Sequence, residues 1–590
     1  MNNKLGRYAL FAVIAAAALF LLKKCLDDTG PGTQPFTLNI RMEAPATTLN
    51  PYLPSPGYSR YVALRIFQTL GDIDPYSLEL KPLLAKSIPE LHRVADGPHK
   101  GELACDFEIN EAAVWDNGTP VTARDVEFSL KIIFHPGLQT QVFRGFFEYL
   151  KSIETNPSNP RKFTCYFSQY YMLALEGLCG VPIYPAYHYD AQNQLANIPL
   201  TDFMDTARVK QVAQNPVAQA FAAEFNQAKY KVDPAFIVGS GPYKLEVMNG
   251  EQGLSLVKKQ NWWGDRAATE SPMLAAYPAR IQYFVVQDET AVENMLRKGE
   301  LDLAVDISPT NFFRMKQDAE LAGNYDFETR WTTRYNRWVF NLSNPKFQDE
   351  KVRHALAQML DYDDFIKNIQ LGLAKRVVGP VNPRKWYYAK DVPLYNYNIE
   401  EAKRLLAEAG WTDSNNDGTV DKVINGQRTE MVIQMFAPPT PKVPELVAVS
   451  IAQSAAKAGV KVVVIPMSIK EIGEKTRAGQ FESATYGAAQ NPGFAEMYQN
   501  YHSASLSSLG GDNRGGFADT TFDRLVTFIR TTEDTAARTR AYVEAQRVLR
   551  ERSPEMFLYS SDFRFIVAKK YAYVISSNRP GYYEQMFRLK

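Results

Sequence analysis

The segment IQYFVVQDETAVENMLRKGELDLAVDIS constrains the fold more than any other part of this sequence. Its pattern predicts a strand at Ile281 to Val286, a helix from about Glu289 to Lys298, and a second strand at Leu301 to Val305. Two strands that are joined through a helix form a right-handed crossover. Because similar alternation recurs along the chain, we expect mixed α/β lobes. A chain of 590 residues is too long for one hydrophobic core and should divide into about two to four domains.

A second local pattern, GSGPYKLEVMNGEQGLSLVKKQNWWG, predicts a β-hairpin. Apolar and polar residues alternate from Tyr243, and Asn249-Gly250 supplies the turn before the alternation resumes at Leu254. We expect the adjacent Trp262 and Trp263 to cap a hydrophobic core.

Two capping pairs predict helices elsewhere. Thr122 and Asp125 open the apolar segment VTARDVEFSLKIIF, and Asn398 and Glu401 open NIEEAKRLLAEAGW. In the second segment Gly410 marks the end of the helix.

The N-terminal residues 1–25 have the features of an export signal. Lys4 and Arg7 precede an apolar run from Tyr8 to Leu22, and Lys23, Lys24 and Cys25 follow it. We expect an uncleaved signal anchor, because the run lacks a well-placed cleavage site. A cleaved signal peptide, lipidation at Cys25 and a buried cytoplasmic helix are the alternatives. Residues 26–36, rich in Gly, Pro and Asp, are expected to form a tether.

The remaining cysteines do not indicate a metal site. Cys105, Cys165 and Cys179 lack the C-x-x-C or Cys/His spacing of zinc ligands. In an oxidising compartment, a disulfide between Cys165 and Cys179 is an option that the sequence leaves open.

Motifs for catalysis are missing from the sequence. It contains no serine-nucleophile elbow, Walker loop, dinucleotide fingerprint or H-E-x-x-H motif, and its six histidines stand in dissimilar contexts. A formal net charge of +1 gives no indication of a nucleic-acid partner. The high aromatic share, 12%, fits a cleft that holds ligands with flat side chains. Binding is therefore a better expectation than catalysis.

One loop, DSNNDGTVD, has the oxygen spacing of a calcium site. The ligands would be Asp413, Asn415, Asp417, the Thr419 carbonyl and Asp421. Ile424 stands where the bidentate Glu of such a loop is needed, so a plain Asx-rich turn is the alternative. Apart from this structural calcium, no cofactor is required.

A series of motifs resembles, in order, the extracytoplasmic solute-binding proteins of ABC transporters, in particular the peptide/nickel-binding family. These motifs are TLNPY at 48–52, KPLLAKSIPE at 81–90, FEINEAAVWDNGTPVTARDVEFSL at 107–130, the GSGPY and NWWG of the hairpin, KGELDLA, FNLSNPKFQDEKVRHALAQMLD at 340–361, and YNIEEAKRLLAEAGW. Each motif alone is weak, but the ordered set is specific.

The resemblance implies an α/β, two-lobed periplasmic-binding-protein fold of type II, in the large peptide-binding subclass. Its first lobe would comprise residues 37–285 with an inserted subdomain at about 81–185, and residues 520–590 would return to it. Residues 286–519 would form the second lobe.

The resemblance also implies a function. A monomer on the periplasmic or extracellular face of the cell membrane would capture a peptide-like or other small polar ligand and deliver it to ABC permease subunits. A ligand sensor on the same fold is the alternative, and a cleft hydrolase is a less favoured one.

The ligand site is expected to combine aromatic walls with few polar groups. Peptide binders of the family often carry an amine-binding Asp in the loop that aligns with YGAAQNPGFAEMY, where this sequence has Ala488. Because the next acid is Glu496, we expect a pocket that does not select a free α-amine. The candidate ligand-binding residues are Tyr486, Gly487, Ala488, Asn491, Phe494, Trp331, Tyr335, Trp386, Tyr387 and Tyr388.

Overall fold

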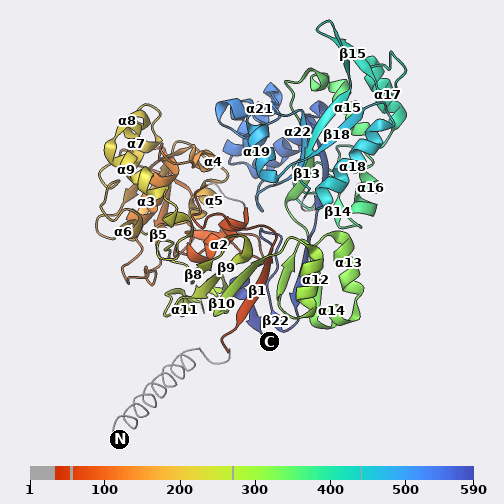
Figure 1. Cartoon of the computed structure of the whole chain (residues 1–590). Coiled ribbons are helices and arrows are strands. Elements are labelled where there is room, and N and C mark those ends of the chain that lie inside the picture. The colour runs from red at the N-terminus through yellow and green to blue at the C-terminus, as the bar shows by residue number, and fades with distance from the viewer. Residues whose placement is uncertain (1–33, 54–56, 269–270, 440–441) are drawn as a thin grey trace.

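The computed structural model describes residues 34–590 apart from 54–56, 269–270 and 440–441. The expected signal segment, Cys25 and most of the expected tether lie outside these residues. Among the described residues, no helix combines the length and the apolar character needed to cross a membrane. Figure 1 shows one body of mixed helix and strand at the upper right and a second body below it and to its left, each built around its own sheet.

The first lobe is built on a seven-stranded sheet. Its strands in spatial order are β12 (Tyr325–Arg330), β21 (Phe563–Ala568), β11 (Leu303–Val305), β1 (Thr37–Met42), β10 (Arg280–Val285), β9 (Gly253–Lys258) and β8 (Tyr243–Met248). Both β10 and β11 pair with β1 in parallel, and α12 (Glu289–Arg297) connects them. The predicted strand-helix-strand unit is therefore confirmed, with β1 inserted between its two strands.

The predicted hairpin is also confirmed, as the antiparallel pair of β8 and β9. Its turn is longer than the two residues expected, because Asn249 N–H donates to Gly253 O around a short 3₁₀ turn. Both tryptophans that follow are buried, and each indole N–H donates to Ser240 O, at 2.8 Å from Trp262 and 3.2 Å from Trp263. They anchor the hairpin to the core of the first lobe.

The second lobe is built on a six-stranded sheet. Its strands in order are β14 (Ala374–Lys375), β20 (Glu555–Ser561), β13 (Arg334–Phe340), β19 (Ser483–Ala489), β17 (Val432–Ala437) and β18 (Lys461–Pro466). α15 (Glu350–Gln358), α17 (Ile399–Glu408) and α18 (Lys442–Ala456) contribute buried residues to the same core. Asn398 caps α17 as expected, since its side chain accepts the N–H of Glu401 at 3.0 Å.

The chain crosses between the sheets at 331–333, between β12 and β13, and again at Asp562, between β20 and β21. The expected lobe limits at 285/286 and 519/520 do not match this strand pairing. α12, β11 and β12 belong with the first sheet, whereas α21 (Thr520–Thr531) and α22 (Thr535–Arg552) lead into β20 of the second. The second lobe therefore spans about 334–561.

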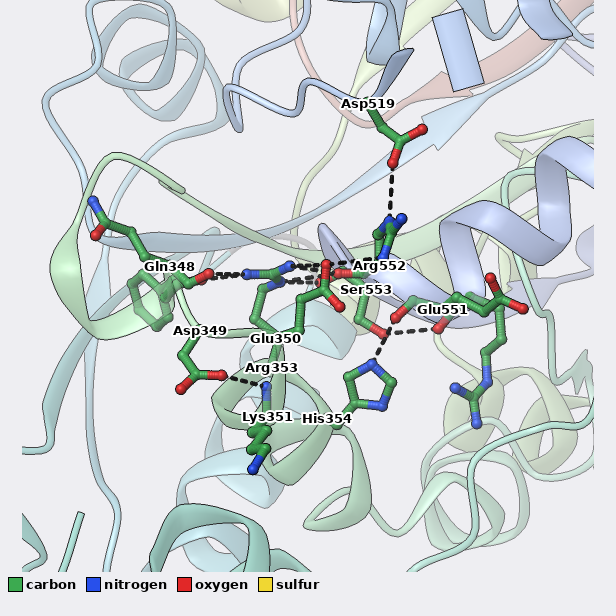
Figure 2. A network of polar contacts seen from close by, with 12 residues as sticks. Gln348, Asp349, Glu350, Lys351, Arg353, His354, Asp519, Glu551, Arg552 and Ser553 are labelled. Carbon is green, nitrogen blue, oxygen red and sulfur yellow. Dashed lines mark hydrogen bonds and ion pairs between the residues drawn. The ribbon is translucent and has the colours of Figure 1, made fainter. Parts of the chain in front are cut away.

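A polar network fixes the end of α22 to the second lobe (Figure 2). The guanidinium of Arg353, on α15, donates to the carbonyls of Arg552 at 2.7 Å and Ser553 at 3.0 Å. It also donates to the carbonyls of Phe347 at 2.7 Å and Gln348 at 2.9 Å. These acceptors include the carbonyls that a helix end leaves unsatisfied, which explains why α22 stays with this lobe.

A subdomain extends from the first lobe and carries a separate sheet in the order β4 (His92–Arg93), β5 (Leu103–Glu108), β7 (Lys162–Phe167) and β6 (Leu150–Thr155). α3 (Ala123–Phe134) packs beside it and starts with the predicted capping box of Thr122 and Asp125. α6 (Ala186–Tyr189) and α7 (Leu200–Met204) contact α3, so the subdomain continues past the expected limit of 185.

All three cysteines that the structure describes are buried and free. The disulfide considered between Cys165 and Cys179 is not formed. Cys165 instead lies opposite Cys105 in the antiparallel pair of β7 and β5, while Cys179 ends α5 (Ala174–Cys179).

Candidate functional site

A cavity of about 370 Å³ lies where the first lobe and its subdomain meet the loop after β19. Asn491 and Pro492, from the second lobe, close one side of it. The apolar lining is Tyr52, Ile73, Leu80, Ile133, Phe143, Phe146, Phe147 and Val181. The polar lining includes Arg60, Asp72 and Glu176. A molecule in this cavity would contact both lobes.

The first lobe provides the aromatic wall of the cavity. α4 (Gln141–Arg144) and the short turn Gly145–Phe147 carry its phenylalanines. The ring of Phe143 packs edge-on against Tyr52 at 5.3 Å, and the guanidinium of Arg60, on α2 (Gly57–Ile66), lies 5.3 Å from the centre of the Phe143 ring. Stacking surfaces of this kind bind flat or apolar groups.

Two carboxyl groups line the cavity. Burial raises the pKa of Glu176, on α5, to about 7, although the charge of Lys385 acts in the opposite direction. Burial also raises the pKa of Asp72, on β2 (Gly71–Ile73), against the effects of the Ile73 N–H and of Arg65. Desolvation disfavours the charged form of both acids, so each would gain from a positively charged neighbour.

The loop that closes the cavity is held by two side chains of the second lobe. Lys385 Nζ donates to Gly493 O at 3.2 Å, and the Tyr387 hydroxyl donates to the same carbonyl at 2.9 Å. Tyr387 also accepts the N–H of Ala495 at 2.9 Å. A Cβ atom added at Gly493 would lie only 2.9 Å from Glu176 Oε1, so glycine allows this loop to approach the opposite lobe closely.

The sequence-predicted residues divide into two groups. Asn491 lines the cavity. Around the neighbouring loop, Phe494 stacks on Tyr387 at 5.7 Å, and Lys385 Nζ lies 5.6 Å from the centre of the Trp331 ring and 5.9 Å from that of Trp386.

The other predicted residues do not line the cavity. Tyr335 and Tyr486 are buried inside the second lobe, where Arg337 lies over both rings. Gly487 and Ala488 pair with Asn336 and Tyr335 in the sheet. Tyr388 packs beside the helical core of this lobe.

Sequence reasoning missed Arg60, Asp72 and Glu176. None of them stands in a recognisable motif, and the fold brings Glu176 to Arg60 and Asp72 from a distant part of the chain. One local signal did point to the cavity, the cluster of Phe143, Phe146 and Phe147. An exposed turn does not need three phenylalanines in a short polar stretch.

The loop expected to hold a calcium ion is linked by internal hydrogen bonds and an ion pair, and calcium binding there stays a prediction. Asp413 accepts the N–H groups of Asp417 and Gly418, and Asp421 accepts from Ser414 and lies 3.3 Å from Arg428 Nε. Across the described residues, no three acidic, His or Cys side chains gather as a metal site would require. The Asx hydrogen bonds of Asp413 fix the backbone of this turn.

Arg530, on α21, links the lobes beside the cavity. Its buried guanidinium donates to Glu148 Oε2 at 2.8 Å and to Gly145 O at 3.1 Å, both in the first lobe. It lies 4.8 Å from the centre of the Tyr171 ring and 3.3 Å from Glu496 Oε2. This contact would form or break when the lobes move relative to one another.

Most of the chain is similar to a known protein family and to solved structures. The family model described as "Bacterial extracellular solute-binding proteins, family 5 Middle" matches residues 79–508. The oligopeptide-binding protein AppA of Bacillus subtilis is 25% identical over 489 residues, which are 82% of this chain and 78% of that protein.

Two solved structures share the fold. One is the AppA structure from Bacillus subtilis in complex with a nonapeptide, with a TM-score of 0.75, 22% identity and coverage of 95% of this chain and 99% of that one. The other is NikZ from Campylobacter jejuni in complex with Ni(L-His), with a TM-score of 0.74, 22% identity and coverage of 94% and 99%. The family match, which extends over most of the chain, establishes that this protein belongs to family 5 of the bacterial extracellular solute-binding proteins and serves an ABC transporter.

Proposed function

We propose that this protein captures a peptide-like or other small polar ligand between its lobes and passes it to the permease subunits of an ABC importer. The observation that carries the proposal is the cavity, which residues of both lobes line. The nonapeptide bound to AppA, a relative with the same fold, supports a peptide-like ligand. The protein would act as a monomer, held at the outer face of the membrane by its N-terminal segment.

Lobe closure would couple binding to delivery. A ligand that contacts both lobes stabilises the conformation in which they are closed, by the amount that its affinity differs between open and closed forms. The permease would then distinguish loaded from empty protein by shape. No bond in the ligand needs to break for this cycle.

Native mass spectrometry of freshly purified protein tests this function. We expect a retained ligand, or binding from a mixed pool of peptides two to nine residues long. Protein that carries no ligand and binds nothing from the pool would contradict a peptide-binding role.

One alternative has a specific observation in its favour. Asp72 and Glu176 are two carboxyl groups in one cavity, as a hydrolase would need. The same experiment separates the two functions, because a bound peptide recovered intact after prolonged incubation excludes its hydrolysis.

A further inference from the structure

Glu176 is the acidic side chain of the cavity that lacks a partner within the described part of the chain. The charged group that acts on its carboxylate is Lys385, and the two do not form an ion pair. Asp72 differs, because its carboxylate accepts the N–H of Ile73 at 2.7 Å and is influenced by Arg65 and Arg60. Glu176 is partly buried, and its carboxylate accepts no hydrogen bond from the described residues, so a ligand that supplies donors would stabilise its charged form.

Lys385 is occupied elsewhere and does not satisfy Glu176. Its ammonium group donates to Gly493 O and lies over the rings of Trp331 and Trp386. Tyr387 donates to the same carbonyl, so both side chains hold the loop in place. The carboxylate oxygen of Glu176 meets this loop at Gly493, on the boundary between the lobes.

From these contacts we infer that Glu176 is the anchor for a positively charged amino group of the ligand, held between α5 and the 491–493 loop. An ammonium group has three N–H donors and no acceptor, which matches a site where a carboxylate lacks donors. Asn491 lines the same cavity, and its side-chain oxygen would accept a second N–H. This inference rests on the proposed function and narrows its ligand class.

The rest of the cavity defines the remainder of the ligand. Phe143, Phe146 and Phe147 form an apolar wall on the first lobe. A molecule that joins an amino group to an apolar or aromatic portion would fill both parts. A peptide with a free N-terminus and an apolar side chain near it meets this description.

The test uses two peptide pools and the full-length protein. Both pools contain peptides of two to nine residues without lysine, arginine or histidine, so that the N-terminal amine is the one cation in each peptide. The second pool is N-acetylated and otherwise identical. We expect the wild-type protein to bind the free pool at least about tenfold more tightly than the acetylated pool, measured by titration calorimetry.

Substitutions locate the source of this preference. Glu176→Gln should reduce the preference to less than about threefold, and Glu176→Asp, which keeps the charge, should retain most of it. Glu79→Gln, at an exposed acid outside the cavity, is the matched control and should leave the preference unchanged. Thermal unfolding verifies that each variant is folded.

Other results would overturn the inference. Equal binding of both pools by the wild-type protein would remove the amine anchor while leaving the peptide-binding function intact. A preference that survives Glu176→Gln, or that Asp72→Asn abolishes instead, would assign the anchor to another acid. Binding of neither pool would reject the inference together with the proposed peptide ligand.

Discussion

Glu176 would bind the ligand at the cost of the stability of the ligand-free protein. Its pKa is raised from an ordinary value of 4.5 to about 7, mainly by burial. Between these two values the folded protein holds a proton that the unfolded chain releases. The free energy of unfolding therefore falls as the pH rises through this window, and above about pH 7 the full cost of burying the charge applies. Binding residues are often destabilising in this way.

Because of this cost, Glu176→Gln should raise the free energy of unfolding by an amount that depends on pH. At pH 4.5 the variant and the wild type should be about equally stable, whereas at pH 7.5 the variant should be more stable by up to about 3 kcal/mol, from the shift in pKa. Both pH values lie below 8, so Lys385, whose pKa burial lowers to about 8, stays largely charged in both measurements. Urea unfolding at both pH values measures the difference. A gain of equal size at pH 4.5 would show that the effect is not due to ionisation.

The same residue shows what sequence reasoning could not reach. Asn491 was predicted because it stands in a loop with a recognisable pattern. Glu176 is on a different lobe, and nothing in ALEGLC distinguishes it from a surface acid of a short helix. The sequence predicted a pocket that does not select a free α-amine, because Ala488 replaces the expected amine-binding Asp. Ala488 lies in β19, outside the cavity lining. Which acids face a cavity depends on long-range packing, which no local pattern encodes.

At the scale of elements, α21 connects the lobes through Arg530. Burial raises the pKa of Glu496, and Arg530 counteracts this because its guanidinium lies beside the carboxylate. The Tyr171 hydroxyl, from the first lobe, donates to the same carboxylate at 3.0 Å. The side chain of Glu148 is 44% exposed, so its pair with Arg530 lies at the rim, whereas the Glu496 pair is internal.

The two ion pairs should therefore differ in strength. Arg530→Met leaves Glu496 buried without a cation and should lower the free energy of unfolding by about 3 to 5 kcal/mol. Glu148→Gln removes only the rim pair and should cost less than about 1 kcal/mol. Chemical denaturation of both variants, with tyrosine fluorescence as the probe, tests this order. If both variants lose the same free energy of unfolding, the Arg530–Glu496 pair stabilises the protein no more than a surface ion pair does.

Elements with local signals were predictable, whereas their assignment to lobes was not. Capping pairs located α3 and α17, and alternation located β8 and β9, because these signals act within a few residues. The crossing at 331–333 has no such signal. Whether α21 and α22 belong to the first or the second lobe is decided by contacts such as those of Arg353 with the end of α22 (Figure 2), which join segments far apart in the chain.

For the whole molecule, the two crossings at 331–333 and Asp562 would be the axis of the proposed lobe closure. Asp306, of the first lobe, forms ion pairs with Arg334 on β13 and with Arg564 on β21, immediately after each crossing. Burial alone would raise the pKa of Asp306, but the two arginines outweigh it and lower that pKa. This charged cluster would hold the strands together at the crossings while the outer parts of the lobes separate, as in hinge closure.

Ligand should consequently make the molecule more compact. Without ligand, the carboxylate of Glu176 favours hydration, and hydration favours an open cleft. A ligand that replaces this water contacts both lobes and shifts the population toward the closed form. Small-angle X-ray scattering should then show a smaller radius of gyration when the free-amine peptide pool is added at saturation. Glu176→Gln, at the same peptide concentration, should remain closer to the ligand-free value because it binds less. An unchanged radius in the wild-type protein at calorimetrically verified saturation would show that binding does not require the lobes to close.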